Sequence, residues 1–391
     1  MKAYLLPLIV LGGSIQPVVA ANDASQNTTT FEYIDDSRGD YLSGWKALLT
    51  NSQPDKLLEN GTWFDASPSP RPLTYKQGNR DLPAPFKKQL KANNTDGLMV
   101  LQGGTVVSEY YRYGFNANQI HLIHSTGKAY TSFACQDVYD QKKQQVMTVP
   151  IAMLVPETEG LHAGNATTEQ ALNMTLATKW SENYEDPNSH TMLSGKIGGW
   201  DPIPKNEQPQ TWSTLYDTPV LGEHGKVWSY NSVSVILASK ACAALAEKDF
   251  SELVQSSYDK LGFEDASWYV SNTFGELSAE GGQAMTMRDF VKLGLFMLEN
   301  DDSTYVQDIW NADGTTAKLM KGYDFVQGYK NYWFKLSDDV IVAIGSSGQL
   351  IYVDKSKDIV IGKFSSFEKG QDKTSFKVAL KLLKDIAEHY Q

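Results

Sequence analysis

Residues 124–135, HSTGKAYTSFAC, contain an S-x-x-K motif, formed by Ser125 and Lys128, at the start of a predicted helix. Ser125 suits the N-cap position, and Ala129 and Phe133 contribute to an apolar face behind it. Because residues three apart share one face of a helix, the Lys128 ammonium can reach the Ser125 hydroxyl. A desolvated lysine loses its proton more easily, so this spacing predicts an activated serine nucleophile.

So short a motif also occurs by chance, and two other interpretations compete with the nucleophile. One is a capped surface helix with a solvated lysine. The other is a phosphate-binding loop, G-x-x-x-x-G-K-[ST], which the residues exclude. Leu122 stands where the first glycine belongs, and Ala129 follows the lysine. The remaining motifs of the chain must therefore decide between a nucleophile and a surface helix.

The composition restricts the class of protein and its partners. The chain has 391 residues, of which 41% are hydrophobic, enough for one large domain or two closely packed ones. Its formal net charge of -11 argues against nucleic acid and anionic membrane surfaces as partners.

Residues 1–21 have the pattern of a signal peptide. Lys2 precedes an apolar stretch at residues 5–19, and Ala20 and Ala21 supply small residues for cleavage. An uncleaved membrane anchor is the alternative, but the stretch is short and is interrupted by glycines and Pro17. We find no other transmembrane pattern, and we therefore expect an exported, soluble protein that is periplasmic or secreted.

Cys135 and Cys242 are the only cysteines. Both lie in apolar stretches with a helical pattern, where buried free thiols are the commoner outcome. An exported protein also permits a disulfide. Because the sequence does not fix the distance between the two residues, we expect free thiols and keep the disulfide as the alternative.

The six histidines form no recognisable metal site. His121 and His124 lack the H-E-x-x-H arrangement and have no carboxylate nearby at ligand spacing. We expect no metal and no cofactor, and a structural role for His124.

Strand patterns occur toward both ends of the chain. Residues 97–111 predict a hairpin that turns at Gly103-Gly104. Apolar or alternating segments return after residue 331, and they predict strands at 332–336, 340–346, 350–353 and 359–364.

Helices are predicted between and around these strands, at 41–49, 231–247, 251–261, 286–299 and 372–389. Residues 51–85 are rich in proline and predict an extended segment. We therefore expect an α/β (α+β) fold with one antiparallel sheet, built from N- and C-terminal strands, flanked by helices and carrying an inserted helical region.

In this interpretation residues 22–391 form a single catalytic domain after the signal peptide. Its sheet subdomain covers about 40–124 and 331–391, and its helical subdomain covers about 125–330.

Three further motifs follow the S-x-x-K motif. They are WSYNS at residues 228–232, GSSGQ at residues 345–349, and the stretch 172–187, which contains Tyr184. The sequence GG at 281–282, followed by TMRD at 286–289, is a fourth recognisable element.

Together these motifs resemble those of the serine β-lactamase and penicillin-binding-protein family. The resemblance is to its class C-like branch, which includes 6-aminohexanoate-dimer hydrolase and related carboxylesterases. Tyr230 matches the tyrosine of the family's Y-x-N element, with Ser232 where asparagine often stands. GSSGQ resembles the G-x-H-G-Q form of the third element, with Ser347 replacing the histidine. The resemblance covers roughly residues 95–366.

The resemblance implies a β-lactamase/transpeptidase-like fold and two-step acyl transfer from a small-molecule ester or amide. Ser125 is then the nucleophile, and Lys128 and Tyr230 share the proton transfers. The backbone N–H groups of Ser125 and Ser346 form the oxyanion hole. Substrate contacts are expected from Tyr184, Ser232, Trp333 and Ser347.

Several of these assignments have plainer alternatives. Tyr184 and Trp333 could equally be packing residues, and Ser232 either steadies Lys128 by a hydrogen bond or only begins a helix. Either Lys128 or Tyr230 could be the principal base.

Three functions compete. The first is an exported serine hydrolase acting on an ester or linear amide. The second is a β-lactamase or D-alanyl carboxypeptidase, and the third is an inactive relative that binds a ligand. The presence of Ser125, Lys128 and Tyr230 together argues against the third, since binding alone has no chemical need of all three.

Overall fold

The structure is a computed structural model that describes residues 44–112, 114–184 and 186–390. The predicted signal peptide at residues 1–21 and the start of the mature chain lie outside these residues. Within the described part, no helix is both long and apolar enough to cross a membrane.

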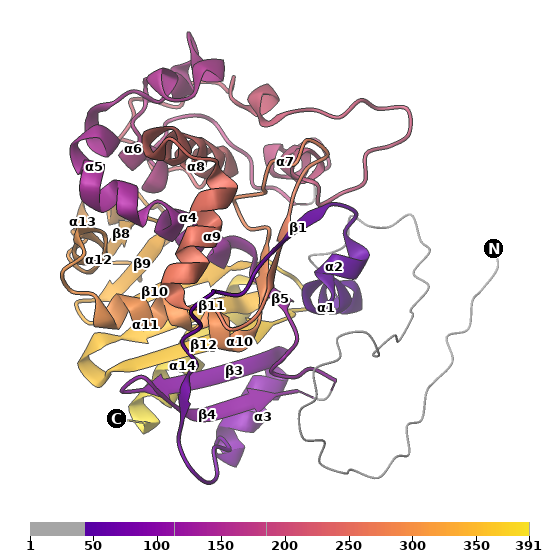
Figure 1. The fold of residues 1–391 in the computed structure, drawn as a ribbon, viewed down its shortest axis with the longest axis vertical. Coiled ribbons are helices and arrows are strands. Elements are labelled where there is room, and N and C mark those ends of the chain that lie inside the picture. Colours follow the sequence, from indigo (N-terminus) through magenta and orange to yellow (C-terminus); the bar gives the residue numbers. More distant parts are fainter. Residues whose placement is uncertain (1–43, 113, 185, 391) are drawn as a thin grey trace. The chain divides into compact units, whose positions relative to one another are not determined.

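An eight-stranded sheet joins segments from the two ends of the chain (Figure 1). Its strand order is β2-β4-β3-β12-β11-β10-β9-β8, and all neighbours are antiparallel except β2 and β4. Pairing of β3 with β12 brings the N-terminal and C-terminal strands together. This confirms the predicted sheet. The bounds are β2 (Thr74–Tyr75), β3 (Thr95–Gln102), β4 (Thr105–Tyr111), β8 (Gly328–Lys330), β9 (Trp333–Ser337), β10 (Val340–Gly345), β11 (Gln349–Asp354) and β12 (Ile359–Ser365).

The predicted hairpin is formed by β3 and β4. Gly103 and Gly104 have φ angles of 54° and 69°, a left-handed pair that a two-residue hairpin turn requires and that glycine adopts without steric cost.

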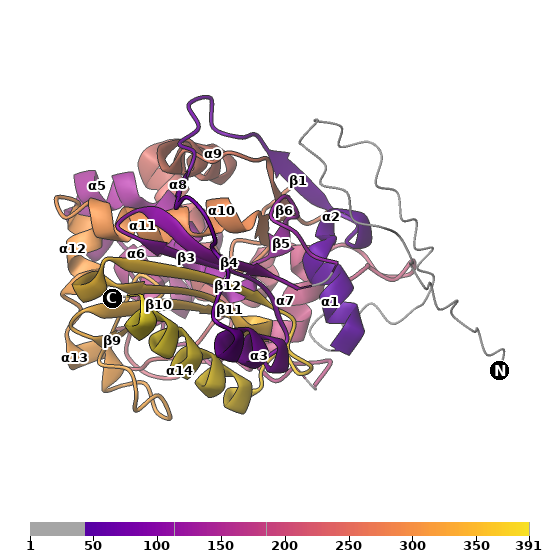
Figure 2. The ribbon, with the colours of Figure 1, turned by 90° about the horizontal axis from the view of Figure 1, so that it is seen from below.

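Helices cover both faces of this sheet (Figure 2). One face carries α3 (Ala84–Ala92) and α14 (Lys373–His389), which contact β3 and β12 respectively. The other face carries α10 (Met287–Phe290) and α11 (Lys292–Glu299), so the helix predicted at 286–299 is interrupted at Val291. The core lies between the sheet and these helices.

The inserted region is mainly helical, as predicted. At its centre α4 (Gly127–Ala134) is buried at every residue and contacts α8 and α9. The inserted region also contains α5 (Gln136–Thr148), α6 (Thr168–Leu172), α7 (His190–Gly198), α8 (Ser232–Ala246), α9 (Phe250–Leu261), α12 (Thr304–Trp310) and α13 (Gly314–Ala317). Two helices precede it in the chain, α1 (Gly44–Ser52) and α2 (Pro54–Leu57).

A second sheet, of four strands, was not predicted. Its order is β1-β6-β7-β5, and it contains β1 (Gly61–Phe64), β5 (His121–Leu122), β6 (Ser267–Val270) and β7 (Gln283–Met285). Strands of two to four residues carry too little alternation to be recognised, and the partners β1 and β6 lie about two hundred residues apart in the chain.

Cys135 and Cys242 form a disulfide with a Cα–Cα distance of 5.6 Å, so the expectation of free thiols is wrong. The bond connects the end of α4 to the middle of α8. It therefore links the helix that follows Ser125 to the helix that follows Tyr230. Its sequence separation is 107, a loop whose closure constrains the unfolded chain by roughly 4–5 kcal/mol in the chain-entropy model.

Candidate active site

The proposed nucleophile lies in a tight turn between β5 and α4. Ser125 belongs to a 3-10 turn, His124–Thr126, and α4 begins only at Gly127, so the predicted N-cap role of Ser125 is wrong. The Oγ1 of Thr126 donates a hydrogen bond of 3.0 Å to the carbonyl oxygen of Gln349. This bond ties the turn to the first residue of β11.

Lys128 contacts Ser125 as the S-x-x-K spacing predicts. Its Nζ lies 2.9 Å from the Ser125 Oγ and donates a 2.6 Å hydrogen bond to the carbonyl oxygen of Glu280. The Lys128 side chain is only 3% exposed. Burial lowers the pKa of Lys128 to about 8, although the carboxylates of Glu182 and Glu280 oppose the shift. A neutral amine is therefore accessible beside the serine near neutral pH.

Two glycines allow other backbone segments to approach this turn closely. A Cβ on Gly345 would lie 2.5 Å from the Ile123 carbonyl oxygen, and one on Gly281 would lie 2.9 Å from the His124 carbonyl carbon. Any larger residue would displace the end of β10 or the segment before β7 from the nucleophile turn. The GSSG and GG elements are thus needed here for close packing.

The backbone N–H groups of Ser125 and Ser346 donate to no other group among the described residues. Ser346 lines the same pocket as Ser125, and its Oγ accepts a 2.6 Å hydrogen bond from the Nε2 of Gln371. Unpaired N–H groups of this kind are what an oxyanion hole requires, so the predicted assignment remains consistent with the geometry.

Tyr230 immediately precedes the N-cap residue of α8. The Oδ1 of Asn231 accepts from the backbone N–H of Val233 at 2.8 Å, and its Nδ2 donates to the Oγ1 of Thr178 at 2.9 Å. These bonds fix the start of α8 and place the Tyr230 ring 5.0 Å from the Lys128 Nζ.

The Tyr230 hydroxyl is a poor base in this environment. Burial is the largest cause that raises its pKa, the nearby Glu182 carboxylate adds to the shift, and the Ser125 hydroxyl offsets part of it. Of the two candidate bases, Lys128 is therefore the one whose pKa favours proton removal from Ser125.

A pocket that is open to solvent surrounds the serine. It gathers Ser125, Lys128, Tyr184, Ser232 and Ser346 from the predicted residues. The remaining lining residues are His124, Thr191, Ser194, Gly195, Trp200, Glu280 and Gly281. No hydrogen bond joins Ser232 to Lys128 among the described residues, so the structure places Ser232 on the pocket wall.

The loop that carries Tyr184 is anchored by a buried carboxylate. The Oε1 of Glu182 accepts a 2.5 Å hydrogen bond from the Nε1 of Trp180, and its Oε2 accepts a 3.0 Å bond from the Tyr184 hydroxyl. Burial raises the pKa of Glu182. Tyr184 lines the pocket, and its contact with a substrate stays a prediction.

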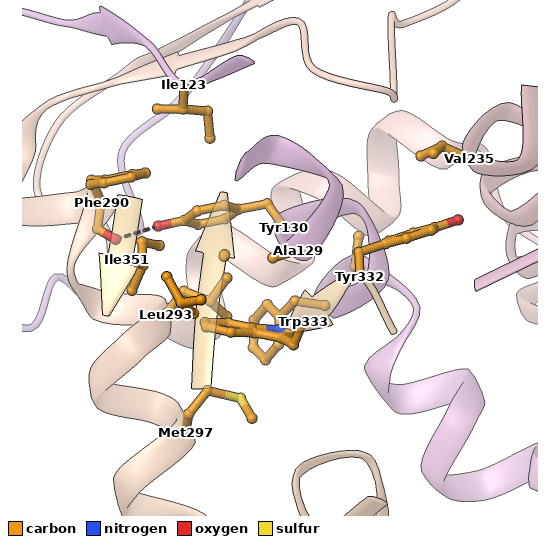
Figure 3. Close-up of a cluster of buried hydrophobic side chains, with 14 of the residues drawn as sticks. Ile123, Ala129, Tyr130, Val235, Phe290, Leu293, Met297, Tyr332, Trp333 and Ile351 are labelled. Atoms are coloured by element: carbon orange, nitrogen blue, oxygen red, sulfur yellow. Dashed lines mark hydrogen bonds between the residues drawn. The ribbon is translucent and has the colours of Figure 1, made fainter. Parts of the chain in front are cut away.

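Two predicted substrate contacts are corrected. Trp333 is 1% exposed and packs in the hydrophobic core with Leu293 and Met297, away from the pocket lining (Figure 3). Ser347 is fully buried, with a φ of 59°, and does not line the pocket. Strand alternation turns Trp333 inward, while the left-handed turn after β10 turns the Ser347 side chain away from the position that its motif suggested.

Sequence reasoning did not assign Glu280, Trp200 or His124 to the site. Burial lowers the pKa of His124 to about 3, and its Nε2 lies 2.7 Å from the Oδ1 of Asn51, so the ring is neutral and held by α1. Glu280 directly precedes the recognised GG element, and this was the only feature of the sequence that could have indicated its place in the site.

Among the described residues, no cluster of three or more His, Cys, Asp and Glu side chains is arranged to hold a metal.

An antiparallel sheet flanked by helices, with the serine turn between the sheet and a helical region, defines the fold of β-lactamases and penicillin-binding proteins. A penicillin-binding protein from Bacillus halodurans superposes with a TM-score of 0.57 at 13% identity, covering 77% of this chain and 99% of that one. The β-lactamase family model matches residues 87–383, and this chain belongs to the β-lactamase family.

Two proteins similar to this chain carry the name 6-aminohexanoate-dimer hydrolase. A 6-aminohexanoate-dimer hydrolase from Paenarthrobacter ureafaciens is 26% identical over 299 residues, which cover 72% of this chain and 75% of the relative. A Bacillus anthracis protein provisionally named 6-aminohexanoate-dimer hydrolase superposes with a TM-score of 0.80 at 21% identity, covering 91% and 97% of the two chains. The chain is thus a β-lactamase-fold hydrolase related to 6-aminohexanoate-dimer hydrolase, as the sequence motifs predicted.

Proposed function

We propose that this protein is an exported serine hydrolase that cleaves a linear amide or an ester through an acyl-enzyme on Ser125. The observation that carries the proposal is the 2.9 Å contact between the Lys128 Nζ and the Ser125 Oγ, in a buried site where the pKa of Lys128 falls to about 8. Sequence similarity to a 6-aminohexanoate-dimer hydrolase supports a linear amide as the substrate class.

In the acylation step the neutral Lys128 amine takes the proton of the Ser125 hydroxyl as its oxygen attacks the carbonyl carbon. The N–H groups of Ser125 and Ser346 stabilise the oxyanion. The amine or alcohol then leaves with a proton. Because burial keeps Tyr230 protonated, its hydroxyl is suited to donate that proton, and Lys128 can return one to Tyr230.

The charges on the pocket wall favour neutral substrates over β-lactams. Many β-lactamases and penicillin-binding proteins carry K-T-G at the third element, where the lysine supplies charge for the substrate carboxylate. Here residues 345–347 contain no cation, and Lys128 is the only lysine or arginine among the described lining residues. A charge-assisted hydrogen bond from such a cation is worth roughly 1.5–3 kcal/mol. The buried carboxylate of Glu280 would instead disfavour an anionic substrate.

Turnover should therefore be measured across a nitrophenyl ester, a short linear amide, a D-alanyl peptide and a penicillin. We expect turnover of the ester and the amide well above that of the penicillin, and no turnover by Ser125→Ala. Penicillin hydrolysis faster than that of any simple ester would identify a β-lactamase instead. Saturable ligand binding without turnover of any substrate would identify an inactive relative.

The Cys135–Cys242 disulfide supports export, because such bonds persist in oxidising compartments. Sequencing the N-terminus of the protein recovered from the host tests this part of the proposal. Export predicts a mature chain that starts near residue 21, whereas an intact Met1 in cytoplasmic protein would contradict it.

A further inference from the structure

Glu280 occupies a distinctive position next to the nucleophile. It directly precedes Gly281, which packs against the Ser125 turn, and its carbonyl oxygen accepts the 2.6 Å hydrogen bond from Lys128. The residue is 7% exposed and is one of those that line the pocket. A carboxyl group is therefore held beside the reacting centre by the same residue that orients the lysine.

The two oxygens of this carboxyl group differ in their hydrogen bonding. Oε1 accepts hydrogen bonds from the Oγ of Ser278, at 2.5 Å, and from the Nε1 of Trp200, at 3.2 Å. Oε2 is buried and has no hydrogen-bond partner among the described residues. A buried acceptor without a donor is destabilising, so Oε2 requires a donor that enters through the pocket, and water is the smallest one.

Glu182 is a second buried carboxylate near Lys128, and its hydrogen bonding differs from that of Glu280. It is also buried and also close enough to Lys128 to act on its charge. Both of its oxygens, however, are occupied by Trp180 and Tyr184. Glu182 thus holds the loop in place, whereas Glu280 keeps an acceptor available.

We propose that Glu280 is the general base that activates the water which hydrolyses the acyl-enzyme. The inference rests on the acyl-enzyme of the proposed function and assigns its second step. Burial raises the pKa of Glu280 from its ordinary value, which strengthens the carboxylate as a base.

In this step the water gives one proton to the Glu280 Oε2 while its oxygen bonds to the acyl carbon. The proton on Glu280 passes through pocket water to the neutral Lys128 amine. When the oxyanion collapses and the bond between the acyl carbon and the Ser125 Oγ breaks, that oxygen takes this proton from Lys128. The product leaves as a carboxylic acid that keeps the second proton of the water. Glu280 is thereby left as a carboxylate and Lys128 as a neutral amine, the states in which the next acylation begins.

Glu280→Gln tests the assignment by stopped-flow kinetics with a nitrophenyl ester. Glutamine keeps an oxygen for Ser278 and Trp200 but cannot accept a proton. We expect a normal burst of nitrophenol, a steady-state rate lowered about 100-fold or more, and an acyl adduct on the Ser125 peptide in mass spectrometry. Hydroxylamine attacks esters without a general base, so it should discharge this adduct and restore turnover.

Glu182→Gln is the matched control, because it also removes a buried carboxylate near Lys128. Loss of this carboxylate changes the acylation rate through the pKa of Lys128, but deacylation should stay fast, so no acyl adduct should accumulate on the Ser125 peptide. Glu280→Asp, which keeps the charge but withdraws the oxygen by one methylene, provides a second variant with slowed deacylation and hydroxylamine rescue.

Deacylation at the wild-type rate in both Glu280 variants would overturn the inference, as would an adduct that hydroxylamine fails to discharge. The proposed function fails by a different result, namely the absence of any burst or turnover in the wild-type protein.

Discussion

Lys128→Ala is expected to slow acylation of Ser125 by about 100-fold or more, the range for a positioned base. The variant removes the only amine within hydrogen-bond distance of the serine among the described residues, since the Lys128 Nζ lies 2.9 Å from its Oγ. The burst rate with a nitrophenyl ester measures this step directly. Added methylamine should restore part of the rate if the lost function is proton removal.

The pH dependence of wild-type activity is expected to follow the titration of the Lys128 amine. The active form is the neutral amine, and burial lowers the pKa of Lys128 to about 8. We therefore expect kcat/KM to rise from pH 6, to reach half of its maximum near pH 8, and to level off above about pH 9. An acylation rate unchanged in Lys128→Ala, or a pH profile flat over this range, would contradict the assignment of Lys128 as the base.

Tyr230→Phe is expected to lower turnover of an unactivated amide by about 100-fold or more. It keeps the aromatic ring beside Lys128 and removes only the hydroxyl, which burial holds in its protonated form. An amine leaving group needs that proton, whereas nitrophenolate needs little help. The nitrophenyl ester should consequently lose much less activity than the amide.

Tyr329→Phe is the matched control for this variant. Tyr329 is buried in the same aromatic cluster, with its ring 5.8 Å from that of Trp228. Ser125 influences the pKa of Tyr230, but it has no such influence on Tyr329. The control variant should retain activity on both substrates. Near-full amide turnover in Tyr230→Phe would show that Tyr230 serves only in packing.

The sequence was sufficient for the parts of the fold that long, regular patterns encode. The strands after residue 331, the hairpin at 97–111 and the helices at 231–247 and 251–261 were all recognisable, and they agree with the structure to within a few residues. The spacing of Ser125 and Lys128 also fixed their contact, because a single turn of chain connects them.

The remaining features depend on contacts between distant segments. The disulfide joins residues 107 positions apart, and the second sheet pairs strands too short to show a period. Ser347 matched a motif position but occupies a left-handed turn that buries it, and Trp333 lies on the inward face of β9. Glu280 reaches the site through the close packing of Gly281, which no local pattern encodes.

The role of Ser125 as the nucleophile is tested most directly by covalent labelling. The protein should be treated with a fluorophosphonate probe, digested and mapped by mass spectrometry. The account predicts one phosphonyl adduct per chain, on the peptide that contains Ser125, and none in a folded Ser125→Ala variant. Labelling that persists in Ser125→Ala, or that maps to another residue, would contradict it.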